Sequence, residues 1–158
     1  MESGNRRHAC SCRQFETQDA RAGEIRRTDP ACFGGEFGGW SLFMKDGKLH
    51  YAHNYLKTQE YLVSSDHAVP AGKHQLSVRF TPNSQSLKPD FSTGNIVLAI
   101  DGQTVGELQD IKVAGQYSAV TGYGLLVGRN TGTAVSHLYQ PPFAFNGTIE
   151  NLVVKLKQ

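Results

Sequence analysis

The sequence predicts an all-β fold: a two-sheet antiparallel β-sandwich with jelly-roll connections and an irregular N-terminal tail. Three observations predict this fold class. Strand-like runs recur about every eight to twelve residues, which is typical of sandwiches. Seventeen glycines and six prolines supply turn residues between these runs. No segment from Phe33 onward favours a helix, so we expect about eight or nine strands.

Length and charge limit the classes of partner. A chain of 158 residues fits one domain and can bury a sizeable core. The net charge of +2 is too small to predict a nucleic-acid partner. The N-terminus has no apolar stretch, and no run approaches the roughly 18 apolar residues that cross a bilayer. We therefore expect no signal peptide, no membrane partner and, by default, a cytoplasmic location.

Residues 1–30 differ in character from the rest of the chain. They are polar, rich in arginine and poor in β-branched residues. Such composition is typical of a disordered or weakly helical tail, and the weak helix would run from Glu16 to Arg27. The sandwich domain is then expected at residues 31–158.

Two hairpins are predicted by Asp-Gly pairs. Asp46-Gly47 separates the strand-like runs 39–45 and 49–55. An Asp-Gly pair between two such runs is the strongest short-range hairpin signal, because a type I′ turn needs positive φ at both central residues. The same arrangement recurs where Asp101-Gly102 separates residues 95–100 and 104–108.

The remaining strands are predicted from apolar or alternating runs. Residues 74–80 alternate clearly, with Leu76, Val78 and Phe80 on one face. The polar stretch 81–93 is expected to be a long loop. Three further strands are predicted at residues 60–64, at 124–128 as a short buried strand, and within 143–157.

An ordered series of short motifs covers most of the chain after residue 33. The motifs are GGEFGGWSLF (34–43), KDGK (45–48), NYL (54–56), SSD (64–66), PAGKH (70–74), VGRNTGT (127–133), PFAF (142–145) and GTI (147–149). Together they resemble the C-terminal accessory domain of a group of bacterial arylsulfatases. The resemblance implies a concanavalin A-like sandwich that packs on or shields a sulfatase catalytic domain and takes no part in hydrolysis.

The chain departs from that family in two places. Asn130 stands where the family usually has aspartate, which weakens a cation-binding or polar-ligand role for its loop. The family also has a strand-rich lead-in, whereas residues 1–30 do not look like strands. A missing opening strand would leave an unpaired sheet edge, so self-association through an open edge is a further expectation.

Catalytic and metal-binding signatures are absent from the sequence. The string nearest to a sulfatase nucleophile motif, residues 10–13, lacks the required proline. Nucleophile-elbow, zinc-protease and P-loop motifs are missing. The cysteines Cys10, Cys12 and Cys32 are odd in number and lack zinc-site spacing. We therefore expect no enzyme, no catalytic residue, no cofactor and no metal.

Two non-catalytic roles stay open: a packing module for a catalytic domain, and a free-standing lectin-like module that binds a glycan. For the second role, Tyr51, His53 and Tyr55 share one side of a strand and would form a polar-aromatic platform if that side is exposed. The same stripe would otherwise face the core. Arg129 and Asn130, in the loop after a predicted strand, are the next candidate ligand-binding residues.

Overall fold

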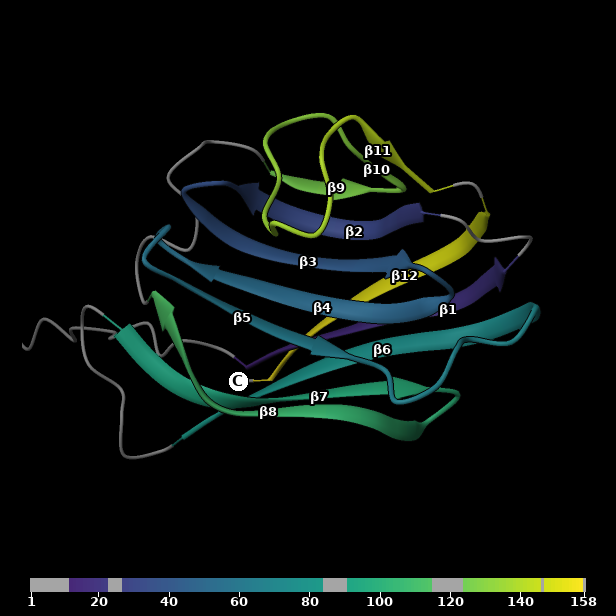
Figure 1. Ribbon diagram of the computed structural model, residues 1–158. Helices are drawn as coiled ribbons and strands as arrows, with labels where there is room; N and C mark the ends of the chain where they lie inside the picture. Colours follow the sequence, from purple (N-terminus) through teal and green to yellow (C-terminus); the bar gives the residue numbers. More distant parts are fainter. Residues whose placement is uncertain (1–11, 23–26, 84–90, 115–123, 146, 158) are drawn as a thin grey trace, which may run out of the picture.

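The computed structural model describes residues 12–22, 27–83, 91–114, 124–145 and 147–157, and every regular element within these ranges is a strand (Figure 1). The first sheet has the order β12-β1-β6-β7-β8 and the second sheet β5-β4-β3-β2-β9. A small third sheet pairs β10 with β11. All pairings are antiparallel. These features confirm the all-β, jelly-roll-like sandwich.

The strands of the first sheet are β12 (Thr148–Lys157), β1 (Cys12–Ala22), β6 (Gly72–Pro82), β7 (Phe91–Ile100) and β8 (Gln103–Ala114). Those of the second sheet are β5 (Gln59–Ser64), β4 (Lys48–Tyr55), β3 (Gly38–Lys45), β2 (Arg27–Gly35) and β9 (Leu125–Val127). The small sheet consists of β10 (Arg129–Asn130) and β11 (Phe143–Ala144).

The main core lies between the two large sheets. Alternate residues of strands such as β3, β6 and β7 point into it, as the period of a β-strand requires. Buried side chains of the first sheet meet buried side chains of the second: Leu76, Val78, Ile96, Leu98, Ile100 and Ile111 on one side, and Trp40, Leu42, Met44, Leu49 and Tyr51 on the other. Both Asp-Gly hairpins are confirmed, with positive φ at both residues of each pair.

The N-terminal segment corrects the prediction of a tail. β1 lies between β6 and β12 and pairs with both of them, and β2 already begins at Arg27. The prediction relied on the lack of an apolar stripe, but a strand paired on both sides is held by its backbone, whatever its composition. Strand β1 also fills the position expected to be empty, so the predicted missing strand is wrong too. Residues 1–11 and 23–26 lie outside the described residues.

Two details further along the chain also differ from the prediction. β9 is mostly exposed, because it is a three-residue edge strand; Leu125 is 42% exposed and Val127 43%. The strands β6 and β7 extend into the predicted loop at 81–93, up to Pro82 and from Phe91, while residues 84–90 lie outside the described residues. In the described ranges no helix is long and apolar enough to cross a membrane.

A second, smaller core lies on the outer face of the second sheet. Residues 129–145 fold over this face, with β10 and β11 above β2 (Figure 1). Phe43 and Ala52 project outward from β3 and β4 and pack against Tyr139 and Phe143 from the covering segment. This second layer of apolar packing fixes the covering segment on the sheet.

Candidate functional site

The structure places the predicted aromatic platform inside the protein. Tyr51 is only 5% exposed and His53 4%, and Tyr51 belongs to the main core. Burial raises the pKa of Tyr51 and lowers the pKa of His53 to about 4. Tyr55 is half-buried at the end of β4. The side of β4 that carries these residues faces the core, which is the second of the two alternatives given above, so these residues form no exposed platform.

The other two predicted site residues lie on β10 and have opposite surroundings. Asn130 is fully buried, and its side chain donates to the Tyr139 hydroxyl at 3.1 Å and to the Thr133 carbonyl at 3.3 Å. It also accepts a hydrogen bond from the Gly132 amide at 3.0 Å. Asn130 therefore organises its loop and is not available to a ligand, whereas Arg129 is exposed.

A hollow of about 500 Å³ lies on the outer face of the second sheet, against the covering segment. We call it the aromatic hollow. Its lining combines polar side chains with two aromatic rings: Lys45, His137, Leu138, Tyr139, Gln140, Pro142, Phe143 and Ala144. A concave site with an apolar lining and a few polar groups is typical of small-ligand sites.

A chain of aromatic contacts fixes the base of the aromatic hollow. Tyr139 and Phe143 are stacked with ring centroids 4.8 Å apart, and Tyr139 lies 5.1 Å from Phe43. Phe43 in turn stacks on His50 at 5.0 Å. The Tyr139 hydroxyl also accepts a hydrogen bond from the Val135 amide at 3.3 Å. The rings are therefore held in one arrangement by packing and hydrogen bonding together.

Positive charge surrounds the aromatic hollow. Lys45 lines it, Lys48 lies directly opposite Lys45 on β4, and Arg129 lies directly opposite the lining residue Ala144. Among the described residues, neither the Lys45 ammonium nor the Arg129 guanidinium has an ion-pair partner. An anionic group of a ligand can therefore bind these two cations without displacing a described carboxylate.

The ionisable groups next to these cations are held by neighbours. Burial lowers the pKa of His50; the bond from its Nε2 to the Lys45 carbonyl and the charge of Asp46 oppose this shift, and the charges of Lys45 and Lys48 add to it. The Glu60 carboxylate is bound to His137 Nδ1 at 2.8 Å and also accepts from the Ser136 hydroxyl. The Glu60 carboxylate is therefore already engaged by two neighbours.

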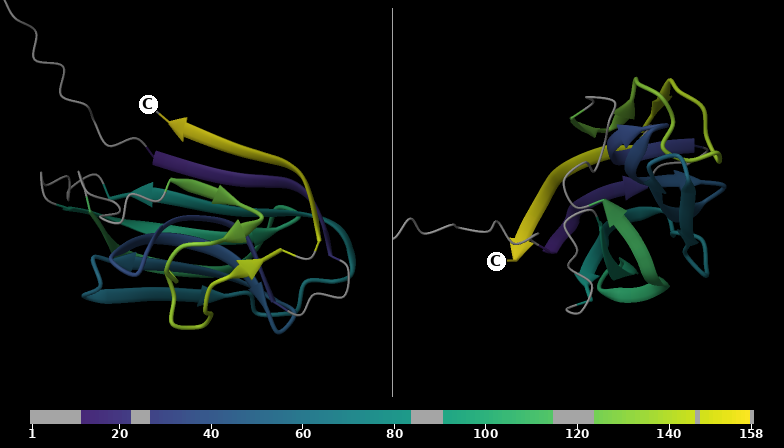
Figure 2. Two further views of the ribbon diagram at one scale, coloured as in Figure 1. Left: turned by 90° about the horizontal axis from the view of Figure 1, so that it is seen from above. Right: turned by 90° about the vertical axis from the view of Figure 1, so that its left-hand side faces the viewer.

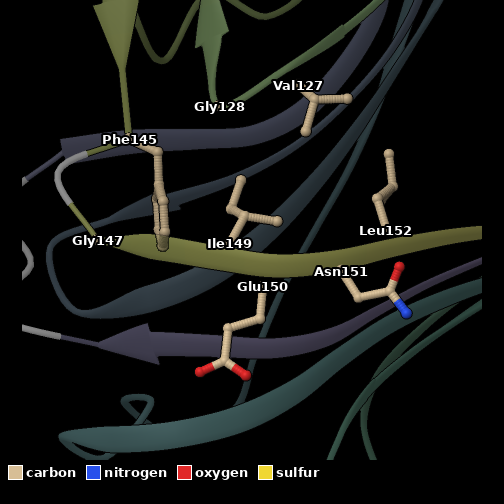
Figure 3. Close-up of a pocket in the computed structure, with 8 residues that line it drawn as sticks. All are labelled: Val127, Gly128, Phe145, Gly147, Ile149, Glu150, Asn151 and Leu152. Atoms are coloured by element: carbon tan, nitrogen blue, oxygen red, sulfur yellow. The ribbon is translucent and has the colours of Figure 1, made fainter.

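A second hollow, of about 470 Å³, lies between the edge strands β9 and β12 (Figure 3). We call it the open-edge groove. Ile149 and Leu152 point from β12 towards Val127, and Phe145 closes one end, whereas Glu150 and Asn151 point to the opposite side of β12. The Glu150 carboxylate is paired with Lys73 at 2.9 Å. The apolar side chains of the groove therefore come from β9, β12 and Phe145, while its two polar side chains point to the far side of β12.

Sequence reasoning missed most of the aromatic hollow. Lys45 and residues 142–144 were visible only as parts of motifs. The hollow joins the end of β3 to a segment about ninety residues later, and no local pattern reports such a contact. In the described part of the chain, no three His, Cys, Asp or Glu side chains lie close enough to hold a metal ion together.

No protein-family model matches the chain, and no curated protein matches its sequence. Solved structures do match its fold. Domains LG4-5 of the mouse laminin α1 chain superpose with a TM-score of 0.66 at 12% identity, over 97% of this chain and 38% of that one, so the chain spans well under two thirds of that laminin fragment.

Two further structures have the same architecture. The CBM40 domain of a Ruminococcus gnavus sialidase, solved with α2,3-sialyllactose, has a TM-score of 0.64 at 12% identity over 95% of this chain and 79% of that one. A SAP-like pentraxin from Limulus polyphemus has a TM-score of 0.54 at 12% identity, over 90% and 63%. At such low identity these matches show the fold alone: the chain is a jelly-roll sandwich of the kind found in laminin LG, CBM40 and pentraxin domains.

Proposed function

We propose that this domain is a non-catalytic carbohydrate-binding module and that it holds an acidic glycan in the aromatic hollow. The observation that carries the proposal is the combination of an apolar lining with the Lys45 cation in one concavity, and with Arg129 directly opposite its lining residue Ala144. The apolar lining comes from Leu138 and Pro142 together with the mostly buried rings of Tyr139 and Phe143. Lys45 and Arg129 provide positive charge that has no described carboxylate partner.

The chemistry of such a ligand matches each part of the hollow. The C–H face of a pyranose is apolar and can pack against the apolar lining, while its hydroxyls exchange hydrogen bonds with polar side chains such as His137 and Gln140. A carboxylate or sulfate on the sugar would bind Lys45 and Arg129, since charge-assisted hydrogen bonds are stronger than neutral ones. The glycan class is therefore defined by a negative charge.

The structural comparisons support a glycan ligand without identifying one. The CBM40 domain that shares this fold was solved with α2,3-sialyllactose and with α2,6-sialyllactose. That ligand belongs to the CBM40 domain, and the low identity does not transfer its binding residues. The support for this chain comes from the charges and rings of its own hollow.

Calorimetric titration of the full chain with three sugars tests the proposal: lactose, 3′-sialyllactose and lactose sulfated on its galactose. We expect both acidic sugars to bind more tightly than lactose and to weaken as salt rises. Lys45→Gln and Arg129→Gln should each weaken acidic-sugar binding by about tenfold, the loss of one charged hydrogen bond. Arg79→Gln, an exposed arginine on the first sheet, is the matched control.

Each outcome of this titration bears on the proposal. If lactose binds and the two acidic sugars do not, the domain is still a glycan-binding module, but the proposed role of the cations is wrong. Absence of heat with all three sugars, or equal losses in Arg79→Gln and Lys45→Gln, would contradict the site.

The ordered motifs that resemble arylsulfatase accessory domains favour a second candidate function, packing on a sulfatase catalytic domain. Its test is sedimentation of the chain with a bacterial arylsulfatase catalytic domain prepared without its own C-terminal domain. A one-to-one complex would support this function, and two independently sedimenting species would count against it.

A further inference from the structure

β12 is a long strand at an open edge of the first sheet. In the described part of the chain it pairs only with β1, so one side of a ten-residue strand carries backbone groups without a strand partner. Both views in Figure 2 place β12 on the outside of the sandwich. Such an edge is a template for a further strand, because its free N–H and C=O groups can continue the ladder.

The strand register shows which side chains of β12 face the core. Across the intervening strand β1, Leu152 is in register with Leu76 and Val154 is in register with Val78. Leu76 and Val78 are buried core residues. Residues directly opposite each other share a face of the sheet. Val154 therefore lies on the core side, yet it is 40% exposed, because the second sheet does not extend over it.

The outer side of β12 carries the polar residues. Across β1, Lys155 is in register with Arg79, which is exposed on the outer face. Glu150 and Asn151 both point to the outer side (Figure 3). The strand thus has an acidic group near its start and a basic group near its end, so it is electrostatically complementary to its own reversed copy.

We propose that β12 pairs antiparallel with β12 of a second copy of this chain, around a twofold axis at Val153. The two five-stranded first sheets would then form one continuous sheet. In this register Leu152 lies opposite Val154 of the copy, twice by symmetry, which covers the exposed core-side valine. On the outer side Lys155 lies opposite Asn151 and next to Glu150 of the copy.

Charge decides between this arrangement and a parallel one. Parallel in-register pairing would place Glu150 against Glu150 and Lys155 against Lys155, and like charges directly opposite are destabilising. Antiparallel pairing replaces both repulsions with attractive or neutral neighbours. The Lys73–Glu150 ion pair already holds the Glu150 carboxylate on this face, which limits the entropy lost when the copy binds.

Sedimentation velocity of the full chain from about 1 to about 200 µM tests the proposal, because mass action shifts a reversible dimer within such a range. We expect a dimer that Val154→Lys dissociates at least about 100-fold more readily, since each substitution counts twice across the axis. Asn151→Asp should strengthen the dimer, because it creates two new Asp–Lys pairs. Val127→Lys, on an equally exposed valine of β9, should leave the dimer unchanged.

The design separates loss of association from loss of folding. Thermal unfolding of Val154→Lys checks that the variant folds, and Asn151→Asp probes the same interface without touching the core side. A monomer throughout the concentration range would overturn the proposal. So would a dimer that Val127→Lys dissociates and Val154→Lys does not, since the contact would then lie on β9.

Discussion

At one lateral edge of the sandwich β5 and β8 touch, and at the other β9 and β12 stay apart. At the closed edge the Asp66 amide donates to the Val105 carbonyl at 3.0 Å. Gly106 lies so close to β5 that a Cβ atom there would be 2.7 Å from a Val63 methyl group. At the open edge a groove of about 470 Å³ separates the strands, and Val127 and Val154 are 43% and 40% exposed.

The difference shows that the two edges of one sandwich can serve different purposes. The closed edge seals the core by direct contact, so its residues are under packing constraint. The open edge leaves apolar side chains and a strand edge accessible, which is unfavourable for an isolated monomer but suited to a partner. Substitutions should therefore affect stability at the closed edge and association at the open one.

The largest expected effect concerns His53, which links β4 to β8 near the closed edge. Its imidazole donates to the Lys112 carbonyl, and burial lowers its pKa to about 4. An unfolded histidine takes up its proton near pH 6.5, so the stabilisation is fully present above that pH and is lost as the pH falls towards 4. The free energy of unfolding should be about 3 kcal/mol lower at pH 4 than at pH 7.5 from this residue alone.

Urea unfolding at the two pH values measures the effect of His53. His53→Gln should lose about this much of the pH dependence, and His137→Gln, at an exposed histidine, is the control. If both variants keep the wild-type dependence, His53 is protonated equally in the folded and unfolded states and its role at the closed edge is wrong.

Gly106 should show the next largest effect. In Gly106→Val the new side chain would meet the Val63 side chain and the Ser64 carbonyl oxygen, which lies 3.0 Å from the Cβ position. Overpacking of this kind costs about 2 kcal/mol in the free energy of unfolding. The matched control is Gly124→Val beside β9, where a Cβ meets no atom within 4 Å. Equal losses from the two variants in thermal unfolding would show that the closed edge is no tighter than the open one.

The fold class could be predicted because the strands of the core alternate and the turns carry Asp-Gly. Leu76 and Val78 face inward as their spacing requires, and both hairpins turn where predicted. β1 was not predicted, because its sequence has no apolar stripe. Only its pairing with a strand on either side identifies it as a strand. Its position between β12 and β6 is a non-local property that a one-dimensional pattern does not contain.

The candidate site was less predictable than the fold. Tyr51 and His53 do lie on the same side of β4, as their spacing predicts. The spacing alone does not say which face of a sheet is covered. The second layer over Phe43 decides that question, because it makes the outer face of β4 a packed surface and leaves the aromatic hollow at its border. Arg129 was a useful candidate because it follows a short strand at that border, whereas the buried contacts of Asn130 depend on Tyr139.

The smallest expected effects come from one substitution made at both edges. Val63, at the closed edge, is 8% exposed, and Val154, at the open edge, is 40% exposed. Valine to threonine keeps the shape and replaces one methyl group with a hydroxyl, which costs about 1 to 3 kcal/mol when it is buried without a partner and little when water reaches it. Val63→Thr should therefore lower the free energy of unfolding by about 1.5 kcal/mol, and Val154→Thr by less than about 0.5 kcal/mol. Urea unfolding at low protein concentration measures both values without contribution from a dimer. A larger loss for Val154→Thr than for Val63→Thr would mean that the open edge is covered within the monomer, and the contrast between the two edges would then fail.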